Sequence, residues 1–256
     1  MANLQPIHEK LKEFYRELRT GCYPLLELSG VIDLYDKEEE EYGAGYFGDV
    51  LRSKHAVGEP PYSYFKLFEE FAFITQDIKY ILGVLTTLRP YINNPLGEAG
   101  TYLQTWEDHL YLRYSSFGYQ SVYSFWDRVG DLLYLYFPTN LKSRNAYLGP
   151  VLERIPEVYK STDAYLNLLD FYNTNIKSVL EIRHDLVHHF GFKSSQRWDH
   201  AEHHTNREKL AEKYQEKFNY RDQLEVQFLH CLEGYRLMLA LIQVLPNKKP
   251  SPDELL

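Results

Sequence analysis

The chain has 256 residues, of which 44% are apolar and 25% are charged, and its formal net charge is −8 at pH 7. This composition excludes a disordered or collagen-like chain, because there is enough apolar surface to bury a core. It also excludes a protein that coats nucleic acid non-specifically, since such proteins are basic; any work on nucleic acid must depend on a local patch.

The number of cysteines and the length of the apolar runs indicate the cellular compartment of the protein. Cys22 and Cys231 are the only cysteines, too few for a disulfide framework or a cysteine metal site. Residues 1–20 are charged and lack the apolar core of a signal peptide. The best apolar run, residues 237–245, is about half the length of a membrane span. We therefore expect a cytoplasmic protein without a membrane segment.

Helical signals begin at the amino terminus. Apolar residues at helical spacing predict a helix over residues 4–20 that stops at Gly21. These apolar positions are Leu4, Ile7, Leu11, Phe14, Tyr15 and Leu18. Residues 21–60 are predicted to be irregular, because they hold an acidic run, several glycines and the pair Pro60-Pro61. A second helical pattern covers residues 62–89 and is ended by Pro90.

A long aromatic-rich helix is predicted over residues 101–137 and is closed by Pro138. Gly118 and Gly130 inside it indicate close packing against another helix. Its aromatic residues favour a role in the core and in a dimer face over base stacking, because stacking platforms usually come with local basic charge. Residues 138–160 contain three prolines and are predicted to be a connector with one short helix at most.

The carboxy-terminal half starts with good helix caps at residues 161–163, followed by helical spacing up to Gly191. Residues 192–206 are polar, residues 207–218 indicate a short charged helix, and residues 221–245 an apolar one stopped by Pro246. The fold class predicted is all-α, an antiparallel helical bundle with additional N-terminal helices. The expected domains are an N-terminal extension packing on the bundle (1–100), the bundle (101–246) and a loose tail (247–256).

Histidines are concentrated in one short part of the chain. Familiar phosphate-binding loops, dinucleotide fingerprints, nucleophile elbows and two-histidine metalloprotease signatures are absent from the sequence. By contrast, six of the ten histidines lie between residues 184 and 204. They are His184, His188, His189, His200, His203 and His204. This window is where the sequence concentrates its chemistry.

Within that window, Arg183 and His188 are separated by four residues at the end of the predicted helix, and His184 follows the arginine. This pattern resembles the signature of the HEPN superfamily, in which four to six residues separate an arginine from a histidine and a polar residue follows the arginine. His189 also satisfies the spacing. The pair Arg197 and His203 is a second match, but it lies in a polar connector. The aromatic helix and the amino-terminal extension look most like the Cthe_2314-type branch.

The resemblance implies metal-independent RNA cleavage, in which the ribose 2′-hydroxyl attacks the adjacent phosphate and leaves a 2′,3′-cyclic phosphate. Arg183 would stabilise the phosphate, and His188 would transfer the proton, with His184, Asp185 and His189 in support. These residue types suit the work, because a guanidinium matches phosphate oxygens and a neutral imidazole moves protons near pH 7. The resemblance implies no cofactor, RNA as the substrate, and a stress or defence setting.

The spacing of the two motif residues also bears on whether the protein forms a dimer. Five residues along an ideal helix correspond to about 140° of rotation, so Arg183 and His188 would not share one face of a regular helix. A helix end, a local distortion or a partner chain has to bring them together. Members of the superfamily typically form dimers with their motifs facing each other, so we expect a homodimer; an antitoxin or another partner protein stays open.

Three alternatives remain beside the nuclease. Arg183 could pair with Asp127 or Asp131, and a histidine could cap the helix end, which would make the pair structural. The fold could serve as a non-catalytic interaction or RNA-binding module. Finally, His184 and His188 stand at i and i+4, the spacing of two zinc ligands on one helix face, with His200, His203 or His204 available as a third.

Overall fold

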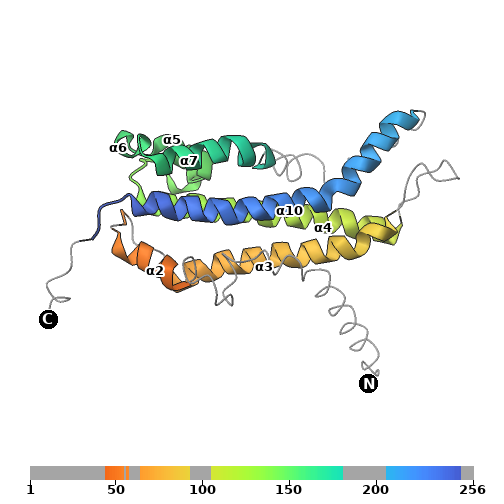
Figure 1. The fold of residues 1–256 in the computed structure, drawn as a ribbon, viewed down its shortest axis with the longest axis horizontal. Coiled ribbons are helices and arrows are strands. Elements are labelled where there is room, and N and C mark those ends of the chain that lie inside the picture. The colour runs from red at the N-terminus through yellow and green to blue at the C-terminus, as the bar shows by residue number, and fades with distance from the viewer. Residues whose placement is uncertain (1–43, 55, 58–63, 93–104, 181–205, 249–256) are drawn as a thin grey trace, which may run out of the picture. The chain divides into compact units, whose positions relative to one another are not determined.

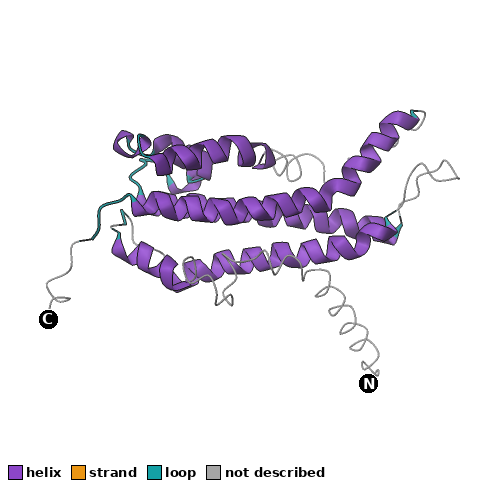
Figure 2. Ribbon diagram, viewed as in Figure 1, coloured by secondary structure: helices purple, strands orange, loops and turns teal. Residues whose placement is uncertain are grey.

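A computed structural model of the chain describes residues 44–54, 56–57, 64–92, 105–180 and 206–248. These residues form helices joined by loops and contain no named β-strand (Figure 2). The main helices are α2 (Ala44–Ser53), α3 (Tyr64–Leu88), α4 (Trp106–Tyr136), α5 (Leu148–Arg154), α6 (Glu157–Lys160), α7 (Asp163–Phe171) and α10 (Arg207–Gln243), labelled in Figure 1. The single-turn elements are η2 (Arg89–Tyr91), η3 (Ser143–Asn145) and η4 (Tyr172–Ile176). The all-α prediction is confirmed.

The chain divides into two compact units, and three helices contribute to both. Of the described residues, unit 1 contains 76–92, 105–121 and 206–228. Unit 2 contains the described residues of 44–75, residues 122–180 and residues 229–248. Each unit therefore combines part of α3 with part of α4 and part of α10. The expected domain boundary between residues 100 and 101 stays a prediction.

Unit 1 is a packing of three helices around an aliphatic and aromatic core. Gly118 of α4 makes the closest approach: a Cβ placed there would lie 2.4 Å from Leu224 of α10 and 3.2 Å from Ile81 of α3. The expectation that this glycine marks helix–helix packing is confirmed. Other buried side chains of the unit are Ile78, Leu82, Leu85, Tyr111, Leu112, Tyr119 and Phe228.

Unit 2 has an aromatic core. Phe47 of α2 stacks on Tyr235 of α10 with a centroid distance of 5.9 Å, and Phe71 of α3 meets Phe125 of α4 edge to face at 5.2 Å. Gly130 lets α4 approach the backbone that enters α5, where a Cβ would lie 2.7 Å from the Leu148 nitrogen. Gly130 thus marks close packing as expected, but against the connector that leads into α5 and not against the side of another helix. Burial of rings of this size supplies most of the energy that holds such a core.

The end of α2 and the end of α10 are tied together within unit 2. Lys54 forms an antiparallel bridge with Asn247, and the Lys248 nitrogen donates to the Ser53 carbonyl at 2.7 Å. The Lys54 Nζ also donates to the Leu245 carbonyl at 2.9 Å. The first two residues of the predicted loose tail, 247 and 248, are thus held by α2.

Three sequence expectations need correction. Part of the segment 21–60 forms the helix α2, because Phe47, Val50 and Leu51 bury their side chains in unit 2 and this outweighs the nearby glycines. The two helices predicted over 207–218 and 221–245 are one continuous helix, α10. The connector 138–160 holds two short α-helices, α5 and α6, and one 3₁₀ turn.

The segment Phe68–Tyr91, in α3 and η2, is long and apolar enough to count as a candidate membrane span. This corrects the expectation that no apolar run approaches that length. However, 61% of its window is buried inside the protein, and the core helix of a globular protein passes the same test. The finding is therefore weak evidence for a membrane segment.

Candidate functional site

The motif residues named from the sequence lie outside the described residues. Arg183 and His188, the supporting residues His184, Asp185 and His189, and the three histidines of the metal alternative all fall within 181–205. Their roles and their mutual placement stay predictions. One structural alternative can be followed further: Asp131, a candidate partner for Arg183, is bound by Arg128 at 2.6 Å.

The helix that leads toward the motif starts where the sequence predicts. Thr162 is the N-cap of α7, and its side chain accepts a hydrogen bond from the Tyr165 nitrogen at 3.4 Å. Tyr165 and Leu168 then point into the core of unit 2. The cap satisfies one of the free N–H groups of the first turn and so fixes the start of the helix.

A π-helical turn, η4, interrupts this helix before the motif. It spans Tyr172–Ile176, and the Asn175 side chain donates to the Phe171 carbonyl at 3.3 Å, which satisfies an oxygen at the junction. Tyr172 packs over α5, where a Cβ at Gly149 would lie 2.4 Å from the tyrosine hydroxyl. Such turns are rare and occur often near functional sites. The helical spacing of the apolar residues did not indicate this turn.

Phe171, at the start of the π turn, contacts two other rings in unit 2. The Trp126 ring of α4 lies 6.4 Å away and the His230 ring of α10 lies 5.5 Å away, edge to face. His230 Nδ1 is buried without a hydrogen-bond partner among the described residues, and burial lowers the pKa of the imidazole below its usual value. A neutral ring is therefore favoured at this position.

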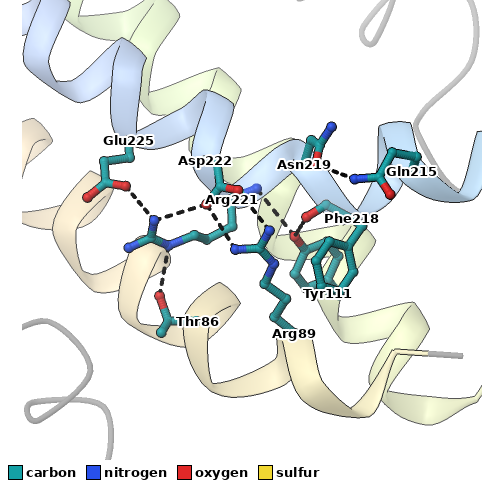
Figure 3. A network of polar contacts seen from close by, with 9 residues as sticks. All are labelled: Thr86, Arg89, Tyr111, Gln215, Phe218, Asn219, Arg221, Asp222 and Glu225. Atoms are coloured by element: carbon teal, nitrogen blue, oxygen red, sulfur yellow. Dashed lines mark hydrogen bonds and ion pairs between the residues drawn. The ribbon is translucent and has the colours of Figure 1, made fainter.

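Unit 1 holds a network of charged side chains at the ends of α3 and α4 and along α10 (Figure 3). Arg89 binds Asp222 through two parallel hydrogen bonds of 2.9 and 2.7 Å. Arg221 donates to Asp222 at 3.1 Å, to Thr86 at 3.1 Å, and to Glu225. Partial burial raises the pKa of Asp222, but the hydrogen bonds from Arg89 and Arg221 oppose this effect. The pKa of Asp222 is therefore held below its usual value.

A tyrosine joins this network to the backbone of α10. The Tyr111 hydroxyl donates to the Phe218 carbonyl at 3.3 Å and accepts from the Arg221 nitrogen at 3.3 Å (Figure 3). The Arg89 guanidinium lies over the Phe218 ring at 4.1 Å. Burial raises the pKa of Tyr111 to about 12, so the hydroxyl stays protonated and keeps its hydrogen bond near neutral pH.

A second charged pair in unit 1 is almost completely buried. Lys217 donates to Asp108 at 2.9 Å, and the two side chains are 1% and 0% exposed. The other oxygen of Asp108 accepts from the nitrogen and the hydroxyl of Thr105 at the start of α4. Burial lowers the pKa of Lys217, while the hydrogen bond and charge of Asp108 oppose that shift.

The positive and negative side chains of the network and of the buried pair balance each other, and this balance limits their ability to bind a ligand. The three cations Arg89, Arg221 and Lys217 bind the carboxylates of Asp222, Glu225 and Asp108. Each of these three cations therefore has a carboxylate partner. A balanced network that joins helices stabilises their packing, and it leaves none of these three cations available to bind a phosphate. Sequence reasoning missed it because Arg89 and Asp222 are 133 residues apart and Lys217 and Asp108 are 109 residues apart. The helical patterns alone indicated that α3, α4 and α10 contain helix.

A metal centre was the third alternative. Over the part of the chain that the structure describes, no group of three or more His, Cys, Asp or Glu side chains could hold a metal ion. The six clustered histidines fall in 181–205, so this alternative stays a prediction. His230 has an aromatic neighbour, Phe171, and belongs to no such group among the described residues.

Comparison with known families decides the assignment. A family model for Cthe_2314-like HEPN proteins matches residues 102–243. The chain belongs to this HEPN family. The match covers α4 through α10 and spans the segment that holds Arg183 and His188. Searches of curated proteins and of solved structures find no match. At the level of the HEPN family, the function is nuclease-like or otherwise related to RNA.

Proposed function

We propose that this HEPN protein is a metal-independent endoribonuclease. The observation that carries the proposal is the family match over residues 102–243, which includes an arginine and a histidine at the family's spacing, Arg183 and His188. RNA is the substrate, and stress or defence is the setting that the family favours. The protein acts in the cytoplasm as a homodimer, and residues 1–100 pack on the bundle formed by residues 101–246.

The reaction divides between the two motif residues. The ribose 2′-oxygen forms a bond to phosphorus, and the bond from phosphorus to the 5′-oxygen breaks, which leaves a 2′,3′-cyclic phosphate and a 5′-hydroxyl. The 2′-hydroxyl loses a proton and the leaving 5′-oxygen gains one. His188 is the group that transfers a proton in this step, because an imidazole can take up or release a proton near pH 7. Arg183 binds the phosphate oxygens, where negative charge grows in the transition state. His184, Asp185 and His189 orient these two groups.

The pairing of described carboxylates with other cations supports this division of roles. In unit 1, Asp222, Glu225 and Asp108 are bound by Arg89, Arg221 and Lys217. Asp131, one of the two carboxylates considered for Arg183, is bound by Arg128. Since a phosphate-binding arginine has to be available to substrate, the pairing of Asp131 elsewhere favours the catalytic role of Arg183.

The decisive experiment is a cleavage assay on mixed RNA in EDTA, with the natural protein beside Arg183→Ala and His188→Ala. We expect cleavage that leaves cyclic phosphate ends, and a loss of at least about a hundredfold in each variant, the usual contribution of a positioned acid–base group. His203→Ala is the matched control, because it removes a histidine of the same window that lies in the polar connector.

Three results would separate the alternatives. Cleavage that requires added zinc or manganese would favour the histidine metal site. Equal cleavage in the natural protein and in both motif variants would mean that the activity resides elsewhere. Absence of cleavage with and without metal, together with RNA or protein binding that survives Arg183→Ala, would favour a non-catalytic module.

A further inference from the structure

One face of α4 in unit 1 is apolar and open to solvent. Trp106 is 68% exposed and Phe117 is 45% exposed, and Leu110 and Tyr114 are partly exposed. Steps of four, four and three residues place these four side chains within about 80° of the helix circumference. Tyr114 and Phe117 contact each other edge to face at 6.1 Å. We call these four residues the aromatic stripe.

The four side chains of the stripe carry no charge. Over the same span of α4, residues 106–117, the charged residues are Glu107, Asp108 and Arg113, and Asp108 is buried against Lys217. Exposed apolar residues scattered singly over a surface are ordinary, whereas a contiguous apolar face marks a site of interaction. Along an ideal helix the stripe extends over about 16 Å, which is three turns. This length suits another short helix as its cover.

Residues 4–20 carry the matching pattern. Their apolar positions, from Leu4 to Leu18, fall within about 100° of a helix circumference and extend over about 21 Å. A helix of this length is marginal by itself in water, so it becomes stable only when its apolar face is covered. The lengths of the two apolar faces agree, and side chains of this kind interdigitate when two helices cross.

The connection between the two permits docking within one chain. The described chain begins at Ala44, and residues 21–43 join it to the predicted helix. Fully extended, these residues reach about 75 Å, which exceeds the roughly 46 Å that the whole of α4 spans as an ideal helix. A tether of this kind holds its end at millimolar effective concentration, so a modest contact suffices for docking.

We propose that residues 4–20 form an amphipathic helix that docks on the aromatic stripe of the same chain. Leu11 and the residues around it cover Trp106 and Phe117. The segment that the HEPN match leaves out thereby completes unit 1. This inference rests on the proposed packing of residues 1–100 on the bundle and does not depend on RNA cleavage, so a failed cleavage assay leaves it standing.

Hydrogen–deuterium exchange of the full-length protein, followed by mass spectrometry, tests the docking. We expect the amides of residues 4–18 to exchange at least about tenfold more slowly than in a free peptide of the same sequence. Trp106→Glu combined with Phe117→Glu should remove that protection. Val158→Glu is the matched control, because Val158 is 71% exposed on α6 and lies outside the stripe. Circular dichroism melts establish that the variants fold.

A second pair of substitutions approaches the contact from the other side. Ile7→Glu with Leu11→Glu leaves α4 unchanged and should abolish the protection in the same way. Exchange at the free-peptide rate in the natural protein would overturn the proposal, and so would protection that survives the two α4 changes. Protection that grows with protein concentration and doubled mass would assign the segment to a second copy. Protection only with anionic vesicles would assign it to a membrane surface.

Discussion

Lys217 and Asp108 hold their charges where almost no water reaches. Removing one partner of a buried pair leaves the other charge without compensation. We expect Lys217→Met to lower the free energy of unfolding by about 3–5 kcal/mol in urea titrations. Arg52→Ala is the control, because Arg52 and Asp49 are 62% and 76% exposed and such pairs contribute about 1 kcal/mol or less. Equal losses in the two variants would contradict the buried-pair account.

His230 carries the pH dependence expected of unit 2. Burial lowers the pKa of the folded imidazole, while an unfolded histidine titrates near about 6.5. The unfolded chain therefore binds more protons below this pH, so the stability contributed by the neutral ring is complete above about pH 6.5 and is lost as the pH falls through the folded pKa.

The measurement for this residue is the melting temperature between about pH 7.5 and pH 5.5, a range centred on the unfolded pKa. We expect the natural protein to lose more of its melting temperature than His230→Leu over this range. The two proteins differ only at position 230, so the difference between them reports His230. An identical pH dependence of the two proteins would show that the ring is not desolvated.

At the scale of helices, Gly234 sets how closely α10 approaches Trp126. A Cβ at this position would lie 2.1 Å from the tryptophan ring, which is itself 1% exposed and cannot move aside easily. We expect Gly234→Ala to destabilise the protein by about 1–3 kcal/mol, the usual effect of overpacking a core.

Gly48→Ala is the comparison for this prediction. Its Cβ would meet only the flexible side chain of Arg52 at 3.3 Å, so the higher helix propensity of alanine should leave stability unchanged or raise it by up to about 1 kcal/mol. Both values come from chemical denaturation. A neutral Gly234→Ala would mean that Trp126 repacks without cost.

At the scale of the whole molecule, the net charge of −8 opposes RNA binding over long distances. If the proposed nuclease reaction holds, binding rests on a few local cations. We expect kcat/KM for RNA to fall at least about tenfold between about 50 and 200 mM salt, because phosphate contacts release counterions. The kcat at saturating RNA should change little. A kcat that fell in parallel would place the salt effect on the chemical step or on the fold.

Local signals in the sequence determined the helical class and most helix ends. Pro90 follows α3, Thr162 caps α7, and Pro246 follows α10, because a missing N–H or a capping hydroxyl acts within a single turn. The spacing of Arg183 and His188 pointed to the HEPN family, which the family match then established. The role of the two residues remains the proposal, since they lie outside the described residues.

Only the tertiary structure decided the features that depend on distant residues. Phe47 is buried in unit 2, and its contacts with Phe68 and Tyr235 make a helix of a glycine-rich segment. Lys217 is buried within α10 because the carboxylate of Asp108, which is distant in the sequence, pairs with its ammonium group. The π turn at Tyr172–Ile176 depends likewise on packing against α5. Periodicity along one helix carries no information about which partner it will meet, so these features could not be read from the sequence.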